Sequence, residues 1–257
     1  MPERRLAAYT MMVLAGVLGW GSLLLFMGFL CVGSLNVVDL AMNTRNALFL
    51  DAGLCLLFFV QHSVMVRKSY RRWQARRVPA EYGDAVYAIC SSLVLLALVV
   101  FWQRSEQTIV VFGGACRVPF HALFLLSVAG FAWGIRSFRH FDPFGMTPVR
   151  HRLRGTQPRP QPFVAVGPYR WVRHPLYLFM LLMIWSCPAL TMDRLLFNLL
   201  WTGWICVVGT ILEERDLVSA FGDTYRQYQR EVPMLIPYRR PQRVASLDRP
   251  SKEAEPR

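Results

Sequence analysis

The feature that most constrains the fold is a long stretch without a charged side chain, residues 9–35. A helix that crosses the hydrocarbon core of a bilayer needs about 20 consecutive apolar residues. Because this stretch exceeds that length, we predict that it forms a transmembrane helix. Arg4 and Arg5 precede it, but it is too long for a signal peptide and no clear small-residue cleavage site follows, so we expect it to be retained.

Five more apolar stretches follow this one. Residues 47–66, interrupted only by Asp51, and residues 85–103 and 118–135 are each near the minimal length for a transmembrane helix. Residues 175–192 and 195–212 are two uncharged runs separated by Asp193 and Arg194, a pattern that predicts a helical hairpin whose arms are marginally long. The sequence therefore predicts an all-α, polytopic integral membrane protein with about five to six transmembrane helices.

The positive charge of the chain follows this topology. The formal net charge is +13, and Lys and Arg gather in the links after the second and fourth apolar stretches. These side chains are Arg67, Lys68, Arg71, Arg72, Arg76 and Arg77, then Arg136, Arg139, Arg150, Arg152, Arg154, Arg159, Arg170 and Arg173. By the positive-inside bias, we expect both basic links and both termini in the cytoplasm. Lipid headgroups are sufficient anionic partners, so we expect a bilayer partner and no nucleic acid.

The cysteines and histidines do not indicate a metal site. The six cysteines are scattered, with no short paired spacing, and we interpret them as small apolar packing residues. His140 and His151 flank a short aromatic loop in which only Asp142 stands nearby as a further ligand. We therefore expect a packed loop and no bound metal there.

Polar residues inside a predicted transmembrane helix are costly, so they are the first candidates for function. Asp51 and His62 are 11 residues apart in the second apolar stretch, which places them on one helix face about three turns from each other. Gln61 and His62 also adjoin the basic link, where polar side chains reach the headgroup region easily. Two roles stay open for this group, packing near the membrane surface and contact with a substrate.

The densest polar group begins at residue 167. Tyr169, Arg173, His174 and Tyr177 stand at helical spacings around Pro175, a residue that suits the first turn of a helix. The start of that helix offers free backbone N–H groups and the positive end of the helix dipole. An anionic group would fit at this position.

Two adjacent carboxylates complete the group. If the last two apolar runs form a hairpin, Glu213 and Glu214 return to the membrane surface that carries Arg173 and His174. This arrangement suits a small ligand of mixed charge. It also suits an ion pair between Arg173 and Glu214 that only clamps the hairpin to the loop, and the residues alone do not decide between these interpretations.

Four segments resemble a known family. GPYRWVRHPLY, from residue 167, and EERDLVSAFGDTYRQYQREVPMLIP, from residue 213, resemble the C-terminal signature of the isoprenylcysteine carboxyl methyltransferase superfamily. Its members are integral membrane enzymes that use S-adenosylmethionine. FFVQHSVMVRKSYRRWQARRVP and SFRHFDPFGM extend the resemblance to about residues 45–238 and are more similar to the bacterial methanethiol S-methyltransferase and NnrU-type branch. The resemblance thus implies a protein of the bacterial inner membrane.

The resemblance also implies which residues bind S-adenosylmethionine. Phe163 and Val164 would flank the adenosine, and Glu213 matches an acid near both cofactor and substrate. The full implied set is Phe163, Val164, Tyr169, Arg173, His174, Pro175, Leu176, Tyr177 and Glu213. Carboxylates and aromatic faces suit the cationic groups of this cofactor, and a helix start suits its carboxylate.

The same resemblance divides the chain into three parts. Residues 1–135 would hold the N-terminal transmembrane helices, and residues 136–237 would hold the cofactor-binding loop, the hairpin and a C-terminal helix, with the cofactor pocket on the cytoplasmic side. Residues 238–257 are rich in Pro, Arg and Glu and are expected to be a disordered tail.

Departures from the family pattern bear on the methyl acceptor. Prenylcysteine enzymes carry an arginine about one turn before the acid pair, where this chain has Gly209, Thr210, Ile211 and Leu212. This absence favours a small thiol over a carboxylate acceptor. The methanethiol branch carries an Arg-Ser-Thr-Tyr element in the segment after Pro79, where only Tyr87 of this chain matches it. This second departure counts against the thiol branch.

The sequence therefore predicts S-methylation of a small thiol, most simply methanethiol to dimethyl sulfide. A thiol is a poor nucleophile until it ionises. His62, His140 or Glu214 are the candidates for accepting its proton, although the field of the sulfonium also favours the thiolate. The alternatives are a carboxyl methyltransferase, a nicotinamide-dependent membrane reductase, and a non-catalytic NnrU-like protein of nitrogen-oxide metabolism.

Overall fold

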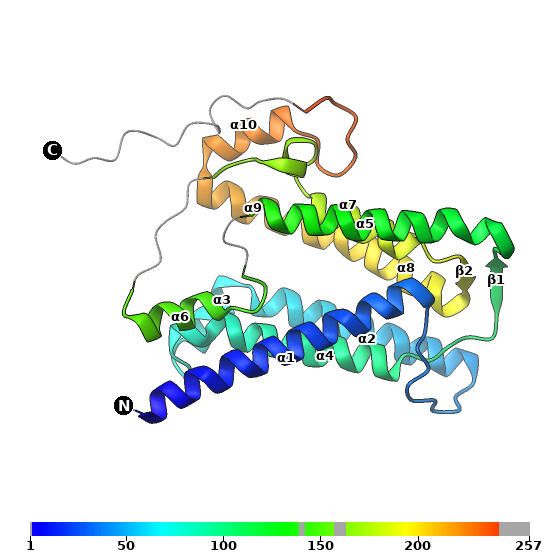
Figure 1. Ribbon diagram of the computed structural model, residues 1–257, viewed down its shortest axis with the longest axis horizontal. Coiled ribbons are helices and arrows are strands. Elements are labelled where there is room, and N and C mark those ends of the chain that lie inside the picture. Colours follow the sequence, from blue (N-terminus) through cyan, green and yellow to red (C-terminus); the bar gives the residue numbers. More distant parts are fainter. Residues whose placement is uncertain (1, 139–141, 157–162, 242–257) are drawn as a thin grey trace. The chain divides into compact units, whose positions relative to one another are not determined.

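The structure, a computed structural model, describes residues 2–138, 142–156 and 163–241. It is built mainly of helices, as predicted, with two short strands (Figure 1). The chain divides into two compact units. Unit 1 comprises Met1–Gly113, Asp142–Arg159 and Cys187–Trp201, and unit 2 comprises Gly114–Phe141, Pro160–Ser186 and Thr202–Arg257.

Unit 1 is organised around three long helices. α1 (Pro2–Val32) and α2 (Thr44–Met65) both pack against α4 (Gly83–Phe101). Two short helices, α3 (Lys68–Gln74) and η1 (Ala80–Tyr82), connect α2 to α4, and α6 (Met146–Arg154) packs against α1. The core is aromatic, because Phe26, Phe29, Trp102, Phe197 and Trp201 are all nearly inaccessible and contact one another.

Unit 2 contains the elements that carry the candidate site. η2 (Gly114–Arg117) leads into α5 (Val118–Ser137), which packs along α7 (Pro175–Trp185) and contacts η3 (Gly167–Arg170). Small residues allow α5 and α7 to approach closely, because a Cβ atom on Gly134 would lie 2.7 Å from Leu176 Cδ2. α10 (Asp223–Glu231) packs on α9 (Thr210–Phe221).

The first arm of the predicted hairpin is shorter than expected. α7 has 11 residues, which corresponds to about 16 Å, so this helix alone is too short to cross the hydrocarbon core. The Ser186 hydroxyl donates a 2.7 Å hydrogen bond to the Met183 carbonyl at the helix end. Pro188 then disfavours a helical conformation for the residue before it.

A short strand that pairs with an earlier strand takes the place of the end of that predicted helix. β1 (Thr108–Val111) and β2 (Ala189–Thr191) are antiparallel and pair Thr108 with Thr191 and Val111 with Ala189. The Phe112 amide extends this ladder by donating a 3.0 Å bond to the Pro188 carbonyl. Both strands belong to unit 1, and β2 lies immediately before the first turn of α8.

The second arm is longer than predicted. α8 (Met192–Gly203), the π-helix η4 (Trp204–Gly209) and α9 follow one another as one run of 30 residues that ends at Phe221. Glu213 and Glu214 therefore lie within helical structure, and not after a helix that ends at residue 212.

Asp193 and Arg194 do not form the hairpin turn. They lie in the first turn of α8, and each is only 2% exposed. Asp193 accepts 3.0 Å bonds from the Trp102 indole and the Ser105 amide, and Arg194 donates a 2.6 Å bond to the Leu30 carbonyl at the end of α1. These bonds offset the cost of burying two charges.

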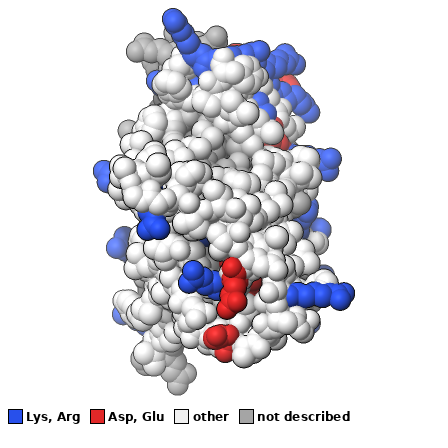
Figure 2. Space-filling model, turned by 90° about the vertical axis from the view of Figure 1, so that its right-hand side faces the viewer, with Lys and Arg blue, Asp and Glu red and all other residues white. Residues whose placement is uncertain are grey.

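The helices fit a bilayer. Over the described residues, five helical segments are long and apolar enough to cross one: Arg5–Val32, Thr44–Met65, Ala80–Phe101, Gly114–Ser137 and Met192–Phe221. Large apolar side chains point outward from them, for example Leu24 at 68% exposed and Phe49 at 66%. Figure 2 shows a face with broad uncharged areas. Such surfaces are rare on soluble proteins, so we conclude that the chain is a polytopic integral membrane protein.

Candidate active site

The turn before α7 depends on a glycine. Gly167 has φ +58, a backbone conformation that side chains other than glycine rarely adopt. A Cβ atom at this position would also collide with the Ser137 hydroxyl of α5. The turn therefore fixes η3 against α5 and sets the position of Tyr169.

Backbone hydrogen bonds then join the start of α7 to the end of the described chain. The Arg173 amide donates a 2.8 Å bond to the Pro233 carbonyl, and the His174 amide donates a 3.1 Å bond to the Met234 carbonyl. His174 stands immediately before the helix and Pro175 is its first residue. The arrangement predicted around Pro175 is thus present, with the first backbone donors of α7 beside His174.

Glu214 is the centre of the site. Arg173 binds its carboxylate in a two-pronged manner, from Nε to Oε1 over 2.7 Å and from Nη2 to Oε2 over 3.2 Å. The Tyr225 hydroxyl donates to Oε1 over 3.2 Å, and the Gln229 amide donates to Oε2. The Glu214 and Arg173 side chains are each only 12% exposed. This carboxylate is therefore saturated with donors.

Arg173 also fixes the helix that follows α9. Its Nη1 donates 2.8 and 2.7 Å bonds to the carbonyls of Gln229 and Val232, at the C-terminal end of α10. A guanidinium is suited to this role because its donors diverge in one plane. One side chain thus connects α7, α9 and α10.

His174 lies between the two carboxylates. Its Nε2 is 2.8 Å from Glu214 Oε1, and its Nδ1 is 3.5 Å from Glu213 Oε2. Burial lowers the pKa of His174, but the hydrogen bonds and charges of Glu213 and Glu214 outweigh it, so the pKa is raised above its ordinary value of 6.5. The ring also stacks on Tyr177, with centroids 5.5 Å apart.

An aromatic group adjoins this charged cluster. Phe163 contacts Phe221, Tyr225 and Tyr228, with centroids 5.1 to 5.4 Å apart. The Tyr228 hydroxyl donates to the Tyr169 carbonyl. Burial, and next the charge of Glu213, raise the pKa of Tyr169, so its hydroxyl retains its proton at neutral pH.

Most of the predicted site residues meet in unit 2. Glu214 contacts both Arg173 and His174, His174 also contacts Glu213, and Tyr177 stacks on His174. Leu176 and Val164, which were also predicted site residues, have other surroundings. Leu176 packs toward Gly134 of α5, and Val164 is 40% exposed.

The two histidines that are candidates for accepting the thiol proton, His62 and His140, lie elsewhere in the chain. His62 belongs to unit 1, where the Tyr87 hydroxyl is 2.9 Å from a ring nitrogen and Phe58 stacks on the ring at 5.2 Å. The neighbouring Gln61 amide donates to the Ser91 hydroxyl over 3.1 Å. His140 falls outside the described residues, as does the predicted tail from residue 242 onward.

Three residues of α10 belong to the site although the sequence did not single them out. Tyr225, Tyr228 and Gln229 all point toward the Arg173–Glu214 pair or the turn at Tyr169. Residues 225, 228 and 229 are spaced i, i+3 and i+4, which places them on one helix face. This spacing in the sequence could therefore have indicated that the three side chains act together.

The two carboxylates differ in what they can do. Glu214 is buried and saturated, whereas the Glu213 side chain is 46% exposed and its contact with His174 is a loose 3.5 Å. The predicted clamp between Arg173 and Glu214 is therefore present, and Glu213 still has acceptor capacity for a ligand. Among the residues that the structure describes, no group of three or more His, Cys, Asp or Glu side chains is arranged to hold a metal ion.

Comparison with known proteins gives the family. The NnrU protein family matches residues 50–223. Proteins named methanethiol S-methyltransferase are 37% identical to this chain. One from a Pseudomonas species aligns over 198 residues, 75% of this chain and 74% of its own, and one from Mycobacterium tuberculosis aligns over 201 residues, 75% and 79%. Methanethiol S-methyltransferase 1 of Bradyrhizobium diazoefficiens aligns over 203 residues, 77% and 70%.

No solved structure matches the chain. The family match nevertheless covers well over half of it, from α2 to the first residue of α10, and so includes both arms of the charged cluster. The named relatives align with about three quarters of the chain at the same level of identity. The chain belongs to the NnrU protein family.

Proposed function

We propose that this chain is a membrane-embedded S-methyltransferase that converts methanethiol to dimethyl sulfide with S-adenosylmethionine as the methyl donor. The observation that carries the proposal is the 37% identity, over 75% of the chain, to proteins named methanethiol S-methyltransferase. The apolar helices support an enzyme whose small apolar substrate arrives through the bilayer.

The cluster in unit 2 fits this donor by the chemistry of its groups. Glu213 offers a half-exposed carboxylate to the ammonium or the ribose hydroxyls. The first backbone donors of α7, at Leu176 and Tyr177, suit a carboxylate. Phe163 and Tyr169 offer aromatic faces to the adenosine, and Val164 an exposed apolar side chain beside them. We propose that these residues, with His174 and Pro175 at the helix start, form the donor site.

Arg173 and Glu214 have a different role in this proposal. Their side chains form hydrogen bonds with each other, with α10 and with His174. We therefore propose that they act as positioning residues that hold His174 and Glu213 in place. When bound, S-adenosylmethionine supplies a methyl group on a sulfonium, and its carbon–sulfur bond breaks as a bond to the thiol sulfur forms and the thiol proton leaves. The contribution of the chain is alignment and the exclusion of water.

Methyl transfer to a thiol also requires a group that accepts the thiol proton. Glu214 is a poor candidate because its carboxylate already receives bonds from Arg173, His174, Tyr225 and Gln229. His62 and His140 are the two remaining side chains that we propose for this step. The pH dependence of kcat in His62→Gln and His140→Gln distinguishes them, because only loss of the base removes the acidic limb of the profile.

Headspace analysis tests the reaction directly. A host that makes no dimethyl sulfide would express the full chain and receive methanethiol, and dimethyl sulfide should accumulate in the gas phase. Glu213→Gln should reduce the yield, whereas Glu106→Gln, an exposed acid of unit 1, should not. No dimethyl sulfide from a membrane-inserted protein that still binds labelled S-adenosylmethionine would mean another acceptor. Loss of that binding as well would favour a non-catalytic NnrU-like protein.

A further inference from the structure

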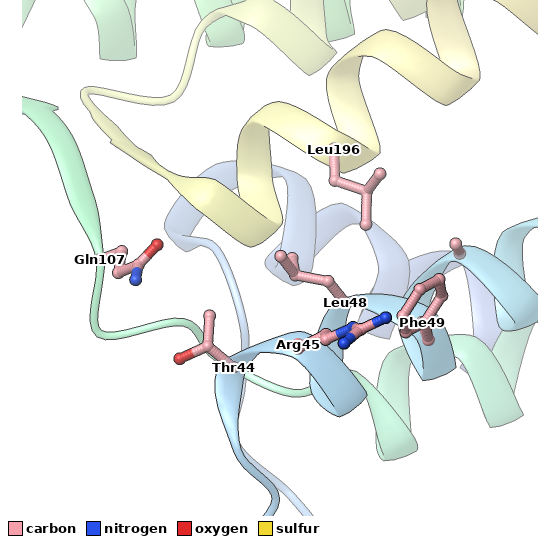
Figure 3. Close-up of a pocket in the computed structure, with 7 residues that line it drawn as sticks. Thr44, Arg45, Leu48, Phe49, Gln107 and Leu196 are labelled. Atoms are coloured by element: carbon pink, nitrogen blue, oxygen red, sulfur yellow. The ribbon is translucent and has the colours of Figure 1, made fainter.

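A cavity lies in unit 1, at the N-terminal end of α2. Its volume is about 500 Å³. Leu48, Phe49 and Ala52 of α2 and Leu196 of α8 form its apolar wall. In Figure 3, Leu196 points from its helix toward Leu48 and Phe49. Neither the candidate active site nor the His62 group shares a residue with this cavity.

The mouth of the cavity is polar and basic. Thr44, Arg45 and Gln107 line it. The Arg45 guanidinium lies 5.6 Å from the centre of the Phe49 ring, so the side chain is held along the cavity wall. Within the described residues, no carboxylate lies within 4 Å of the Arg45 nitrogens. Among the residues that the structure describes, this cation thus has no counter-ion.

The backbone around Gln107 is fixed. Its amide donates a 3.2 Å bond to the Ser105 hydroxyl, and its carbonyl accepts a 2.9 Å bond from the Met192 amide. The first turn of α2 contains no acidic residue, and the Asn43 side chain caps only the Asn46 amide. The backbone donors of Thr44 and Arg45 therefore add to the positive character of the mouth.

The depth of these groups matches the layers of a bilayer. α2 has 22 residues, about 33 Å, which is close to the thickness of the hydrocarbon core. Thr44 and Arg45 at its first turn therefore lie at headgroup level. Leu48, Phe49 and Ala52 follow within about 12 Å, where acyl chains begin.

We propose that this cavity binds one anionic phospholipid from the leaflet at the N-terminal end of α2. The phosphate would meet Arg45, the first amides of α2 and the Gln107 side-chain amide, and an acyl chain would lie against Leu48, Phe49 and Leu196. A headgroup with net negative charge compensates the guanidinium. The site is separate from the proposed methyl transfer and does not depend on it.

Native mass spectrometry of the delipidated full chain tests the site. Phosphatidylglycerol and phosphatidylcholine with identical acyl chains would be compared, with glycerol phosphate as a headgroup without a tail. We expect one tightly retained phosphatidylglycerol per chain. Arg45→Gln should weaken its retention about tenfold, because one charge-assisted contact is lost. Arg45→Lys should retain most of the binding.

Arg104→Gln is the matched control, because Arg104 is an exposed arginine of the same unit that does not line the cavity. It should bind phosphatidylglycerol as the wild type does. Equal retention by the wild type and Arg45→Gln would overturn the proposal, as would equal retention of both lipids. Full occupancy by glycerol phosphate would assign the site to a soluble phosphate compound. If Arg45→Gln does not fold, Arg45→Lys provides the test. This variant must bind phosphatidylglycerol more tightly than phosphatidylcholine, and equal binding of the two lipids would overturn the proposal.

Discussion

Glu214 is the residue on which the candidate site depends most. Its carboxylate receives bonds from Arg173 and His174, just before α7, and from Tyr225 and Gln229 of α10. The Glu214 and Arg173 side chains are both 12% exposed. Glu214→Gln keeps the shape but leaves the buried Arg173 charge without its counter-ion, so we expect a loss of about 3 kcal/mol in the free energy of unfolding. Chemical denaturation of the protein in detergent measures this loss.

The neighbouring acid provides the control for that variant. Glu213 is 46% exposed and makes a looser contact, so Glu213→Gln should leave stability nearly unchanged. A similar loss of stability in both variants would contradict the different roles that we assign to the two carboxylates.

His174 gives stability a defined dependence on pH. Because its pKa in the folded protein is raised above 6.5, the stabilisation from its charged form is complete below about pH 6.5 and is lost as the pH rises through the raised value. The difference in Tm between the wild type and His174→Gln should therefore shrink toward alkaline pH. A difference that grows with pH would mean that His174 is neutral in the folded protein.

At the scale of elements, the turn before α7 has a specific requirement for glycine. Gly167→Ala introduces both an unfavourable φ and a collision with Ser137. Gly155 has φ +65 but no atom within 4 Å of a Cβ atom, so Gly155→Ala isolates the backbone cost of about 1 kcal/mol. We expect Gly167→Ala to lower Tm more than Gly155→Ala and to weaken S-adenosylmethionine binding. Equal effects would show that the contact with Ser137 is unimportant.

The helices were predictable because long apolar runs have few alternatives in a membrane. The hairpin was harder to predict. Hydropathy does not distinguish a helix from a strand over residues 189–191, where pairing with β1 decides the conformation. The charge of Asp193 and Arg194 indicated a surface turn, but bonds to Trp102, Ser105 and Leu30 allow burial.

At the candidate site, the motif and the residue spacing predicted that His174 lies close to Glu213 and Glu214. They did not show which acid is buried. That difference follows from Arg173, Tyr225 and Gln229 all converging on Glu214, and such convergence depends on how α10 folds back on α9.

At the scale of the whole molecule, the charge pattern predicts an orientation. Cys116 is exposed in η2 at the start of α5, and Arg230 lies in α10 of the same unit. We expect a membrane-impermeant maleimide to label Cys116 in spheroplasts. The double variant Arg230→Cys, Cys116→Ser should react at position 230 only after permeabilisation. The reverse pattern would place the candidate site outside the cytoplasm.

We propose that three helices of the membrane protein build the site of methyl transfer. The start of α7 supplies His174 and backbone donors, α9 supplies an open and a buried carboxylate, and α10 holds the buried one in place. If the site binds the methyl donor, substitutions there must change donor affinity without changing the membrane helices.

Equilibrium binding of labelled S-adenosylmethionine to the full chain in lipid nanodiscs is the most direct measurement. The wild type and Glu106→Gln should bind with equal affinity, and Glu213→Gln should bind about tenfold more weakly, since one charge-assisted contact is lost. Binding of Glu213→Gln as tight as that of the wild type would contradict the assignment of the donor site to α7 and α9.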